Sequence, residues 1–519
     1  MITMNLATLA TVTKGQLRSH ESVSSATIDN VIIDSRELTL ENTSKEKNKV
    51  AFLALKGPNF DGHGFARQVV DKGCQVLIVD HYIDDLNIEH VAQVIVDDTR
   101  IALGKIAAYV KQQVAPKTVG ITGSSGKTTV KEMLAAILSR LGKVLATNGN
   151  FNNDIGVPLT LLRLTQEDDF AVIEMGANHI GEIAYTTELV KPDVAMINNI
   201  AAAHLEGFGD LCGVARAKGE IFSGLGADGI ALYNQDTNYT SKWQWRLTDK
   251  KVRTFSCAET QNTDVSKQDA EHTGGSFNAD CYSRNVALDE NGCASFDLQS
   301  SLGQCAIKLN VPGKHNVCNA VAAAAAAIEC GASLQDICLG LADMAPVKGR
   351  LNIHRLVSEN LALNIKLIDD TYNANVESIK AAISLLANYS GKRILILGDM
   401  GELGSEARSY HQEVGEFAKD QGIDVLFTLG VLSQNTSDAF AHKNDAVSKH
   451  FSDRANLSTH LFSLLEQNNP KNHNNQESNI NILVKGSRSA HMEYVVEDIF
   501  SWHASRFEDS ACQALEENT

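Results

Sequence analysis

The stretch Gly120–Thr129 reads GITGSSGKTT, and the residues on either side of it carry two different periodicities. An apolar run that begins at Val119 predicts a short strand up to Thr122. Downstream, apolar side chains recur at the i, i+3, i+4 and i+7 positions of a helix: Val130, Met133, Leu134, Ile137, Leu138 and Leu141. A strand that enters a glycine-rich turn and then a helix predicts a phosphate-binding loop.

Each residue type in this loop suits phosphate chemistry. Glycines allow backbone N–H groups to turn inward around phosphate oxygens, and the N-terminus of the helix adds positive potential. We expect Lys127 to contact the β- and γ-phosphates of ATP and Thr128 to bind magnesium. The spacing departs from the common pattern G-x-x-x-x-G-K-[ST], because Ile121 stands at its first position. The predicted ATP-binding residues of this variant loop are Gly123, Ser124, Ser125, Gly126, Lys127, Thr128 and Thr129.

Strands alternate with helices on both sides of this loop. Apolar runs at Phe170–Ile173 and Val194–Ile197 predict further strands, and the same alternation resumes after residue 347. Such alternation predicts parallel, doubly wound sheets, whose ligands bind beyond the carboxyl ends of the strands. Residues 250–311 are instead polar and contain turn signals such as Glu290–Gly292, so we predict antiparallel strands added to the α/β core.

The length of the chain, 519 residues, is too great for one hydrophobic core and predicts about three domains. Short strands and turns fill the first hundred residues, with apolar runs such as Val50–Leu55 and Val76–Val79. We predict an α/β N-terminal domain over residues 1–98, a central domain over residues 99–346, and a Rossmann-like C-terminal domain over residues 347–519.

The overall charge is strongly negative, because 63 acidic residues face 46 basic ones, which gives −17 at pH 7. This balance argues against general nucleic-acid binding and against an anionic membrane surface, although a local cluster of basic residues can still hold an anionic substrate. The N-terminus lacks the pattern of a signal peptide. The most apolar run, Ala320–Ile328, is far shorter than a membrane span. We therefore expect a cytoplasmic protein with no nucleic-acid partner and no membrane insertion.

The ten cysteines form no C-x-x-C pair and no cluster with histidine at the spacing of a zinc site. Several of them, such as Cys318 and Cys338, have small or apolar neighbours. In a cytoplasmic protein this pattern is typical of reduced structural thiols, so we expect no disulfide bond.

Three further residues stand near the predicted strand ends. Glu174 ends one strand, His204 follows the next, and Lys218 lies 14 residues beyond His204. Taken singly, each is more often a solvated acid, an ordinary loop histidine or a surface lysine. Their shared position at one edge of a sheet raises the expectation that they act together with the phosphate loop.

Sequence blocks along nearly the whole chain resemble the Mur ligase family. In order they are DSREL (34–38), FLALKGPNFDGHGF (52–65), GITGSSGKTT (120–129), TNGNFNNDIGVP (147–158), EMGANHIGEI (174–183), NIAAAHLEGFGD (199–210), GKHNVCNA (313–320), VKGRL (347–351), DDTYNANVES (369–378), LGDMGELG (397–404) and VKGSRS (484–489). Residues 250–311 lie outside these blocks. One block departs from the family pattern, since Thr371 replaces serine and Val376 replaces proline.

The resemblance implies an ATP- and magnesium-dependent ligase that joins a carboxylate to an amine through an acyl phosphate. The blocks are most similar to those of the members that attach D-alanyl-D-alanine to UDP-N-acetylmuramoyl-tripeptide. It further implies a monomer with a nucleotide-sugar domain, an ATPase domain and a C-terminal domain that contacts ATP and the amine. The third residue of the tripeptide, diaminopimelate or lysine, is left open.

The resemblance also assigns roles to individual residues. The residues implied to bind magnesium are Thr128, Glu174, His204 and Lys218, with Lys218 as a carbamate; together with Lys127, the last three are the predicted catalytic residues. Those implied to contact ATP outside the loop are Asn316, Asn319, Arg350 and Asp370. Those implied to bind the other substrates are Asp34, Ser35, Arg36, Lys56, Asn152, Asn153, Asn373, Asn375, Lys485 and Arg488. We expect Asn373 and Asn375 to face the amine substrate, away from the phosphate loop.

Two alternatives remain at this point. One is another ligase of the same family, either the enzyme that adds the third amino acid or a folylpolyglutamate synthetase; the former usually carries a DNPR-like motif, which this sequence lacks. The other is a regulatory NTPase with a phosphate loop and no ligase activity. That alternative accounts for Gly120–Thr129 and leaves the remaining blocks without a role.

Overall fold

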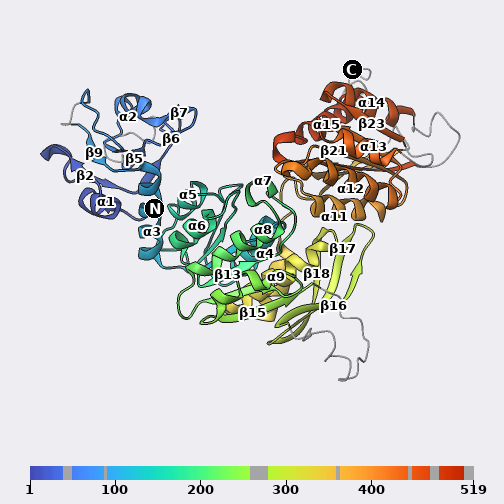
Figure 1. The fold of residues 1–519 in the computed structure, drawn as a ribbon, viewed down its shortest axis with the longest axis horizontal. Helices are drawn as coiled ribbons and strands as arrows, with labels where there is room; N and C mark the ends of the chain where they lie inside the picture. Colours follow the sequence, from blue (N-terminus) through green and yellow to red (C-terminus); the bar gives the residue numbers. More distant parts are fainter. Residues whose placement is uncertain are drawn as a thin grey trace, which may run out of the picture.

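The computed structural model describes residues 1–38, 49–86, 90–257, 279–357, 363–441, 447–467 and 478–507. Within these residues, three large β-sheets lie in three separate lobes, which Figure 1 shows in blue, in green to yellow, and in orange to red. The predicted three-domain α/β architecture is thus confirmed. Every helix in the described part of the chain is too short or too polar to span a lipid bilayer.

The N-terminal lobe contains a sheet with the strand order β2-β9-β8-β5-β4, in which only the pairing of β2 with β9 is antiparallel. Two short ribbons, β1–β3 and β6–β7, lie beside it. The strands are β1 (Met4–Asn5), β2 (Gln16–Arg18), β3 (Thr27–Ile28), β4 (Asn30–Ile32), β5 (Val50–Leu53), β6 (Lys56–Gly57), β7 (Phe60–Asp61), β8 (Val76–Val79) and β9 (Ala92–Ile95); the helices are α1 (Leu6–Thr13) and α2 (Ala66–Asp71).

The central lobe contains a mixed sheet with the order β11-β12-β10-β13-β14-β15-β16-β17-β18. Pairing is parallel from β11 to β16 and antiparallel from β16 to β18, so the predicted antiparallel addition is confirmed. The strands are β10 (Lys117–Thr122), β11 (Val144–Ala146), β12 (Phe170–Glu174), β13 (Val194–Ile197), β14 (Ile230–Asn234), β15 (Lys251–Ser256), β16 (Cys281–Leu288), β17 (Cys293–Ser300) and β18 (Gly303–Pro312). The helices are α3 (Thr99–Val114), α4 (Lys127–Leu138), α5 (Gly156–Leu161), α6 (Glu182–Val190), α7 (Leu205–Phe208), α8 (Leu211–Gly219), α9 (His315–Glu329) and α10 (Leu334–Asp343).

Helices on both faces bury the parallel strands of this sheet, which explains their continuous apolar sequence. Val119 and Ile121 of β10 pack in one core with Val130, Met133 and the alanine-rich helix α9. The predicted stripe of α4 is correct up to Leu138, where the helix ends. Leu141 lies beyond that end and is exposed, so its inclusion in the stripe was wrong.

The C-terminal lobe contains a sheet with the order β19-β20-β24-β21-β22-β23. All pairings are parallel except that of β19 with β20, an antiparallel edge that the alternation pattern did not predict. The strands are β19 (Asn352–Val357), β20 (Leu363–Asp370), β21 (Lys392–Gly398), β22 (Val425–Leu429), β23 (Val447–Phe451) and β24 (Ser478–Lys485). The helices are α11 (Val376–Ala387), α12 (Ala407–Asp420), α13 (Gln434–Phe440), α14 (Arg454–Gln467) and α15 (Glu493–Phe507).

The central and C-terminal lobes meet along the hairpin that links β16 to β17. The hydroxyl of Tyr389 donates to the carbonyl of Asn291 at 2.7 Å, and Arg355 donates to the Asn291 side chain at 2.8 Å. In Figure 1, α11 lies next to β17 at this junction. Residues of the predicted site lie at the carboxyl ends of β10 and β12 in the central lobe and of β20 in the C-terminal lobe. The way in which these two lobes meet therefore matters for function.

Candidate active site

The phosphate loop connects β10 to α4, as predicted. Gly126 precedes the first residue of α4 and has a φ of 73°, a conformation that side chains with a Cβ rarely adopt. A Cβ atom there would stand 2.4 Å from Oδ1 of Asn319, so the site requires glycine for space as well. The amine of Lys127 donates to the carbonyl of Gly123 at 2.8 Å, across the turn of the loop. Burial lowers the pKa of Lys127, while the nearby Glu174 acts in the opposite direction.

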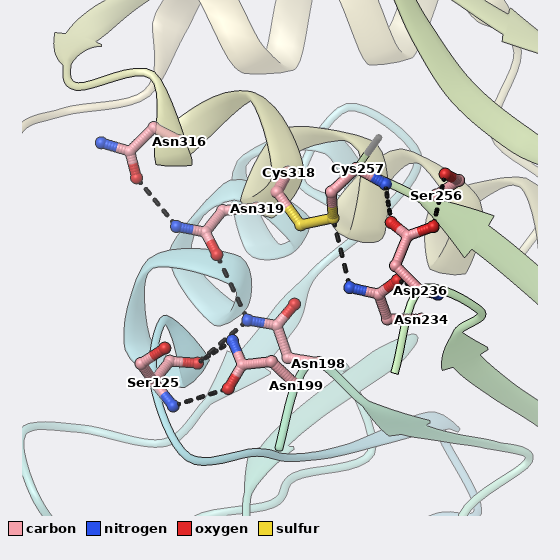
Figure 2. The surroundings of a disulfide bond; sticks show 10 residues. All are labelled: Ser125, Asn198, Asn199, Asn234, Asp236, Ser256, Cys257, Asn316, Cys318 and Asn319. Carbon is pink, nitrogen blue, oxygen red and sulfur yellow. Dashed lines mark hydrogen bonds between the residues drawn. A yellow bond between two sulfur atoms is a disulfide. The ribbon is translucent and has the colours of Figure 1, made fainter. Parts of the chain in front are cut away.

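Two asparagines after β13 hold the loop in shape. The side chain of Asn199 accepts from the backbone N–H groups of Ser124 and Ser125 at 3.1 and 2.9 Å. The amide of Asn198 donates to the carbonyl of Ser125 at 3.0 Å and to Oδ1 of Asn319 at 3.2 Å. Figure 2 shows these side chains pointing toward one another between the loop and α9. Sequence reasoning gave neither asparagine a role, although Asn199 opens one of the quoted blocks.

Asn316 and Asn319, two of the residues implied to contact ATP, lie on the first turns of α9. Asn319 donates to Oδ1 of Asn316 at 2.8 Å, and Asn316 donates to the carbonyl of Pro312 at 2.7 Å. The chain of amides therefore runs from Ser125 through Asn198 to α9 (Figure 2). This chain fixes α9 relative to the phosphate loop, as a site for one nucleotide requires.

Glu174 ends β12 and is 2% exposed. Its carboxylate accepts from the Thr128 hydroxyl at 3.0 Å and from the Asn152 amide at 2.8 Å. Its backbone N–H donates to the hydroxyl of Thr147 at 3.0 Å. A carboxylate and a hydroxyl held together beside the phosphate loop form the oxygen set that magnesium prefers. The structure thus brings Thr128, Glu174 and Asn152 together, whereas the Asn153 side chain accepts from the backbone N–H of Gly156, the first residue of α5, at 2.7 Å.

Lys218 lies inside the protein at the end of α8, with 1% of its surface exposed. Its amine lies 5.4 Å from the centroid of the Phe208 ring and has no hydrogen-bond partner among the described residues. Burial, and then the charge of Lys127, lowers the pKa of this amine to about 7. Burying an amine without a hydrogen-bond partner costs free energy, so such a group calls for an explanation.

His204 follows β13 in a left-handed conformation, with a φ of 55°. Its ring contacts Phe208 edge-on, with ring centroids 6.3 Å apart. Its Nδ1 atom contacts the carboxylate of Glu402 in the C-terminal lobe. Lys218 and His204 therefore both contact Phe208, which brings them to one side of the phosphate loop.

The C-terminal lobe contributes two basic residues to this junction. A guanidinium nitrogen of Arg350 lies 3.5 Å from the hydroxyl of Thr128, and the guanidinium stacks over the Tyr372 ring at 4.4 Å. The amine of Lys485, 1% exposed, donates to the Asp370 carboxylate at 2.6 Å and to the carbonyl of Asn373 at 2.8 Å. Arg350 thus reaches the phosphate loop, while Lys485 and Asp370 form a buried pair that supports the Asn373 loop.

The Asn375 side chain does not lie where we expected it. It caps α11 by accepting from the N–H of Ser378 at 2.8 Å, and its amide donates to the Ser124 carbonyl of the phosphate loop at 3.4 Å. The expectation that this loop lies away from the phosphate loop was therefore wrong for Asn375. The reason is that the two lobes meet, so the carboxyl end of β20 approaches that of β10.

The remaining predicted residues lie apart from the phosphate loop. Asp34 binds Arg36 through paired hydrogen bonds of 2.6 to 3.0 Å, and the Arg36 side chain is 88% exposed. This pair, Ser35 and Lys56 belong to the N-terminal lobe, where the amine of Lys72 donates to the Ser35 carbonyl at 2.8 Å. Arg488 pairs with Glu493 at 3.0 Å in the C-terminal lobe.

The expectation of no disulfide bond was wrong. Cys257, just after β15, is bonded to Cys318 on α9, with Cα atoms 4.9 Å apart (Figure 2). The end of β15 packs directly against the first turns of α9, which brings together two residues 61 positions apart. Cys74, Cys212, Cys281, Cys293, Cys305, Cys330 and Cys338 are free.

These residues fit the groups that the resemblance implies. Thr128 and Glu174 offer oxygen ligands for magnesium, and His204 offers a ring nitrogen. The buried amine of Lys218, which has no hydrogen-bond partner among the described residues, fits a lysine that is carried as a carbamate. Lys127 and Arg350 supply positive charge for phosphates. Such a site can neutralise and orient a transferring phosphoryl group.

Comparison with known proteins agrees with this geometry. Residues 121–327 match the family model of the Mur ligase middle domain, and residues 349–488 match that of the Mur ligase glutamate ligase domain. The chain is 45% identical to the UDP-N-acetylmuramoyl-tripeptide–D-alanyl-D-alanine ligase of Escherichia coli, over 96% of this chain and 98% of that protein. It is 33% identical to the ligase of the same name from Bacillus subtilis, over 96% and 99%.

Solved structures give the same result. A crystal structure of MurF from Acinetobacter baumannii superposes with a TM-score of 0.82 at 35% identity, covering 96% of this chain and 99% of that one. A second structure from that organism, named as the UDP-N-acetylmuramoylalanyl-D-glutamyl-2,6-diaminopimelate–D-alanyl-D-alanyl ligase, has a TM-score of 0.79 at 34% identity, with the same coverage. The fold, the phosphate loop and the relatives agree, and the chain belongs to the Mur ligase family.

Proposed function

We propose that this chain joins D-alanyl-D-alanine to UDP-N-acetylmuramoyl-tripeptide, with ATP as the phosphoryl donor and magnesium as cofactor. The observation that carries this proposal is the cluster beside Lys127 in which Thr128 and Asn152 both donate to Glu174. Arg350 of the C-terminal lobe reaches Thr128 in this cluster. A regulatory NTPase would account for the phosphate loop and leave the matching blocks of the other two lobes without a role. The named relatives, which match almost the whole chain, support the same substrates.

The chemistry starts from a carboxylate, which is a poor electrophile because oxide would have to leave. Transfer of the γ-phosphoryl group to a carboxylate oxygen forms an acyl phosphate and releases ADP. The deprotonated amine of the dipeptide then attacks the carbonyl carbon, and the tetrahedral intermediate collapses to an amide and inorganic phosphate. Phosphoryl transfer needs positioning and charge stabilisation more than covalent help from the protein.

The residues of the junction would divide this work. Lys127 and Arg350 place positive charge at the phosphates, and Asn198 and Asn199 keep the backbone N–H groups of the loop in position. Thr128, Glu174 and His204 would hold magnesium, which when bound neutralises charge on the phosphoryl oxygens. Asn316 and Asn319 would contact the adenine from α9.

Lys218 would act as a carbamate. The neutral amine attacks carbon dioxide, a C–N bond forms, and a proton is released, so that an ammonium is replaced by a carboxylate. Three observations support this: the amine is buried, it has no hydrogen-bond partner among the described residues, and its pKa is lowered to about 7. A carbamate oxygen is a hard ligand of the kind that magnesium prefers.

The other lobes would bind the remaining substrates. The N-terminal domain would cover residues 1–98 and the central domain residues 99–346. The N-terminal residues that would contact the uridine nucleotide are Asp34, Ser35, Arg36 and Lys56. The C-terminal domain at residues 347–519 would place Asn373, Asn375, Lys485 and Arg488 near the reacting peptide ends. Asp370, which pairs with Lys485, would contact the ATP from the same lobe. The enzyme would act as a monomer in the cytoplasm, where ATP is present, without a nucleic-acid partner. Its net charge of −17 agrees with the last point.

The test is a ligation assay with purified protein. The reaction contains ATP, magnesium, D-alanyl-D-alanine and the nucleotide tripeptide that ends in diaminopimelate, the residue in the name of one relative from Acinetobacter baumannii. We expect the amide product and one phosphate per product, and phosphate release only when both the nucleotide and the dipeptide are present. Steady phosphate release from ATP alone, without product, would instead indicate the regulatory NTPase.

A further inference from the structure

Glu402 joins the C-terminal lobe to the central one by three contacts. It lies in the loop between β21 and α12, and its carboxylate contacts Nδ1 of His204. The same carboxylate accepts from the side-chain amide of Asn178 at 3.3 Å. Its backbone carbonyl accepts from the N–H of Glu206 at 3.3 Å. One residue thus contacts two different loops of the central lobe, both next to the phosphate site.

The backbone on both sides of this contact is unusual. Glu402 has a φ of 61° and His204 a φ of 55°, and in the described part of the chain only eight residues other than glycine have a positive φ. This conformation costs a non-glycine residue roughly 1 kcal/mol or more, so surrounding contacts must hold it. Two such residues face each other across the lobe boundary. Strained backbone of this kind is frequent at functional sites.

The loop that carries Glu402 is firmly held at its base. The N–H of Met400 donates to Nε2 of the buried His411 at 3.0 Å. The carboxylate of Asp399 accepts from the N–H groups of Val431 and Ser433 at 2.9 and 2.7 Å. Because these hydrogen bonds hold the base of the loop, they restrict the Glu402 side chain to one position.

The contact determines which nitrogen of His204 is available to a metal ion. A carboxylate at Nδ1 favours the proton on that atom, which leaves the lone pair of Nε2 free. Histidines that bind metals usually donate their other ring N–H to a carboxylate or carbonyl in this way. The edge-on contact with Phe208 limits rotation of the His204 ring.

We propose that Glu402 is a positioning residue of the metal site: it holds His204 with Nε2 directed to magnesium, and it does so only when the C-terminal lobe is docked. This inference rests on the proposed function, because it takes His204 as a magnesium ligand. Docking of the third domain would then raise the metal affinity of the central domain. The metal site would be complete only when the lobe that binds the amine is in place.

The test compares Glu402→Ala and Glu402→Gln with Glu406→Ala, a matched control that removes an exposed carboxylate four positions along the same loop. The probe is Mn²⁺ with saturating ADP, and its affinity is read from the EPR signal of free Mn²⁺. We expect Glu402→Ala to weaken Mn²⁺ binding about tenfold, the lower end of the usual effect of losing such a partner. Glu402→Gln should weaken it less, because its amide oxygen still accepts from Nδ1–H, and Glu406→Ala should match the wild type.

A second measurement reports on the ring itself. In protein labelled with ¹⁵N-histidine, we expect His204 in the wild type to carry its proton on Nδ1, and Glu402→Ala to lose that preference. Assignment comes from the signal missing in His204→Gln. If Glu402→Ala misfolds, which its Tm would reveal, the Glu402→Gln protein supplies both measurements.

Two results would overturn the inference. One is Mn²⁺ affinity in Glu402→Ala within twofold of the wild type, and the other is an equal loss in Glu406→Ala. Failure of the proposed function looks different, since the wild-type protein would then form no amide product while the Mn²⁺ comparison between the variants could still succeed. A merely structural role for Glu402 would lower the Tm and leave the proton of His204 on Nδ1.

Discussion

The phosphate site and the Asp34–Arg36 surface of the N-terminal lobe use charged residues in opposite ways. At the phosphate site Glu174 and Lys218 are 2% and 1% exposed, and Glu174 has its partners in place. On the N-terminal surface the Arg36 side chain is 88% exposed, and its guanidinium bonds to the carboxylate of Asp34 in the same short turn. Buried charges act strongly because little water screens them, and exposed charges act weakly for the opposite reason.

From this difference we expect the buried residues to perform chemistry and the exposed residues to recognise substrate. Preorganised charge in a dry site stabilises a transition state without further rearrangement. Exposed charge on a flexible side chain mainly helps a charged ligand to bind in the right orientation. Substitutions at the two regions should therefore differ both in size and in the kinetic constant that they change.

The largest effect should follow Lys127→Ala. We expect kcat to fall about 100-fold or more, because removing one such contact typically costs that much. Circular dichroism and the Tm should stay close to those of the wild type. A variant that keeps more than about a tenth of the wild-type kcat would remove Lys127 from the transition state and weaken the comparison.

Lys218→Ala should come second, with kcat reduced more than about tenfold, since a lost carbamate removes a ligand worth at least ~1.4 kcal/mol in the transition state. Added acetate should partly restore activity by occupying the vacated space. The control is Lys191→Ala, which removes an exposed lysine of the same domain. A fully active Lys218→Ala enzyme, or equal acetate stimulation of the control, would exclude the carbamate.

The third prediction concerns stability. Lys485→Met should lower the free energy of unfolding of the C-terminal domain by about 3–5 kcal/mol, because it leaves the buried carboxylate of Asp370 unpaired. The double variant Lys485→Met, Asp370→Asn should regain a large part of this loss. Urea unfolding followed by tryptophan fluorescence measures both. A loss in the single variant no larger than that of a surface substitution would mean that the pair is not buried in solution.

Substitutions in the Asn373–Asn375 loop should have smaller effects that separate two roles. Asn375→Ala loses a helix cap worth about 1 kcal/mol and a contact to Ser124, so it should raise KM for both ATP and the dipeptide. Asn373→Ala should raise KM for the dipeptide alone. Unchanged KM for ATP in Asn375→Ala would show that the contact between the lobes does not form during turnover.

The smallest effect should follow Arg36→Ala. The exposed pair with Asp34 contributes little to stability, so the Tm should stay the same. KM for the nucleotide tripeptide should rise a few-fold, with kcat unchanged and a stronger effect at low salt, where charge is less screened. A large fall in kcat would contradict the division between buried chemistry and exposed recognition.

The sequence was sufficient for those features that depend on neighbouring residues. The phosphate loop is local, since a strand, three glycines, a lysine and an apolar helical stripe are adjacent in the sequence, and its strand–turn–helix form was predicted correctly. Glu174 could be selected because it ends a strand on the same edge of the sheet. The separation into an α/β core and added antiparallel strands followed from a change in periodicity.

Other features depend on contacts between distant segments. Asn199 meets Ser125 from 74 positions away, Glu402 meets His204 from the next domain, and Cys257 meets Cys318 across 61 positions. No local pattern marks such pairs, because asparagine, glutamate and cysteine at those places are equally common without such a partner. The contact of Asn375 with the phosphate loop was missed for the same reason.

The most direct test of the account is the fate of one oxygen atom. A nucleotide tripeptide with ¹⁸O in its reacting carboxylate is converted with ATP, magnesium and D-alanyl-D-alanine, and the released phosphate is analysed by mass spectrometry. Ligation through an acyl phosphate predicts one ¹⁸O atom in each phosphate, because the carboxylate oxygen leaves with the phosphoryl group. Phosphate that contains no ¹⁸O, formed at the same rate as the amide, would contradict the account.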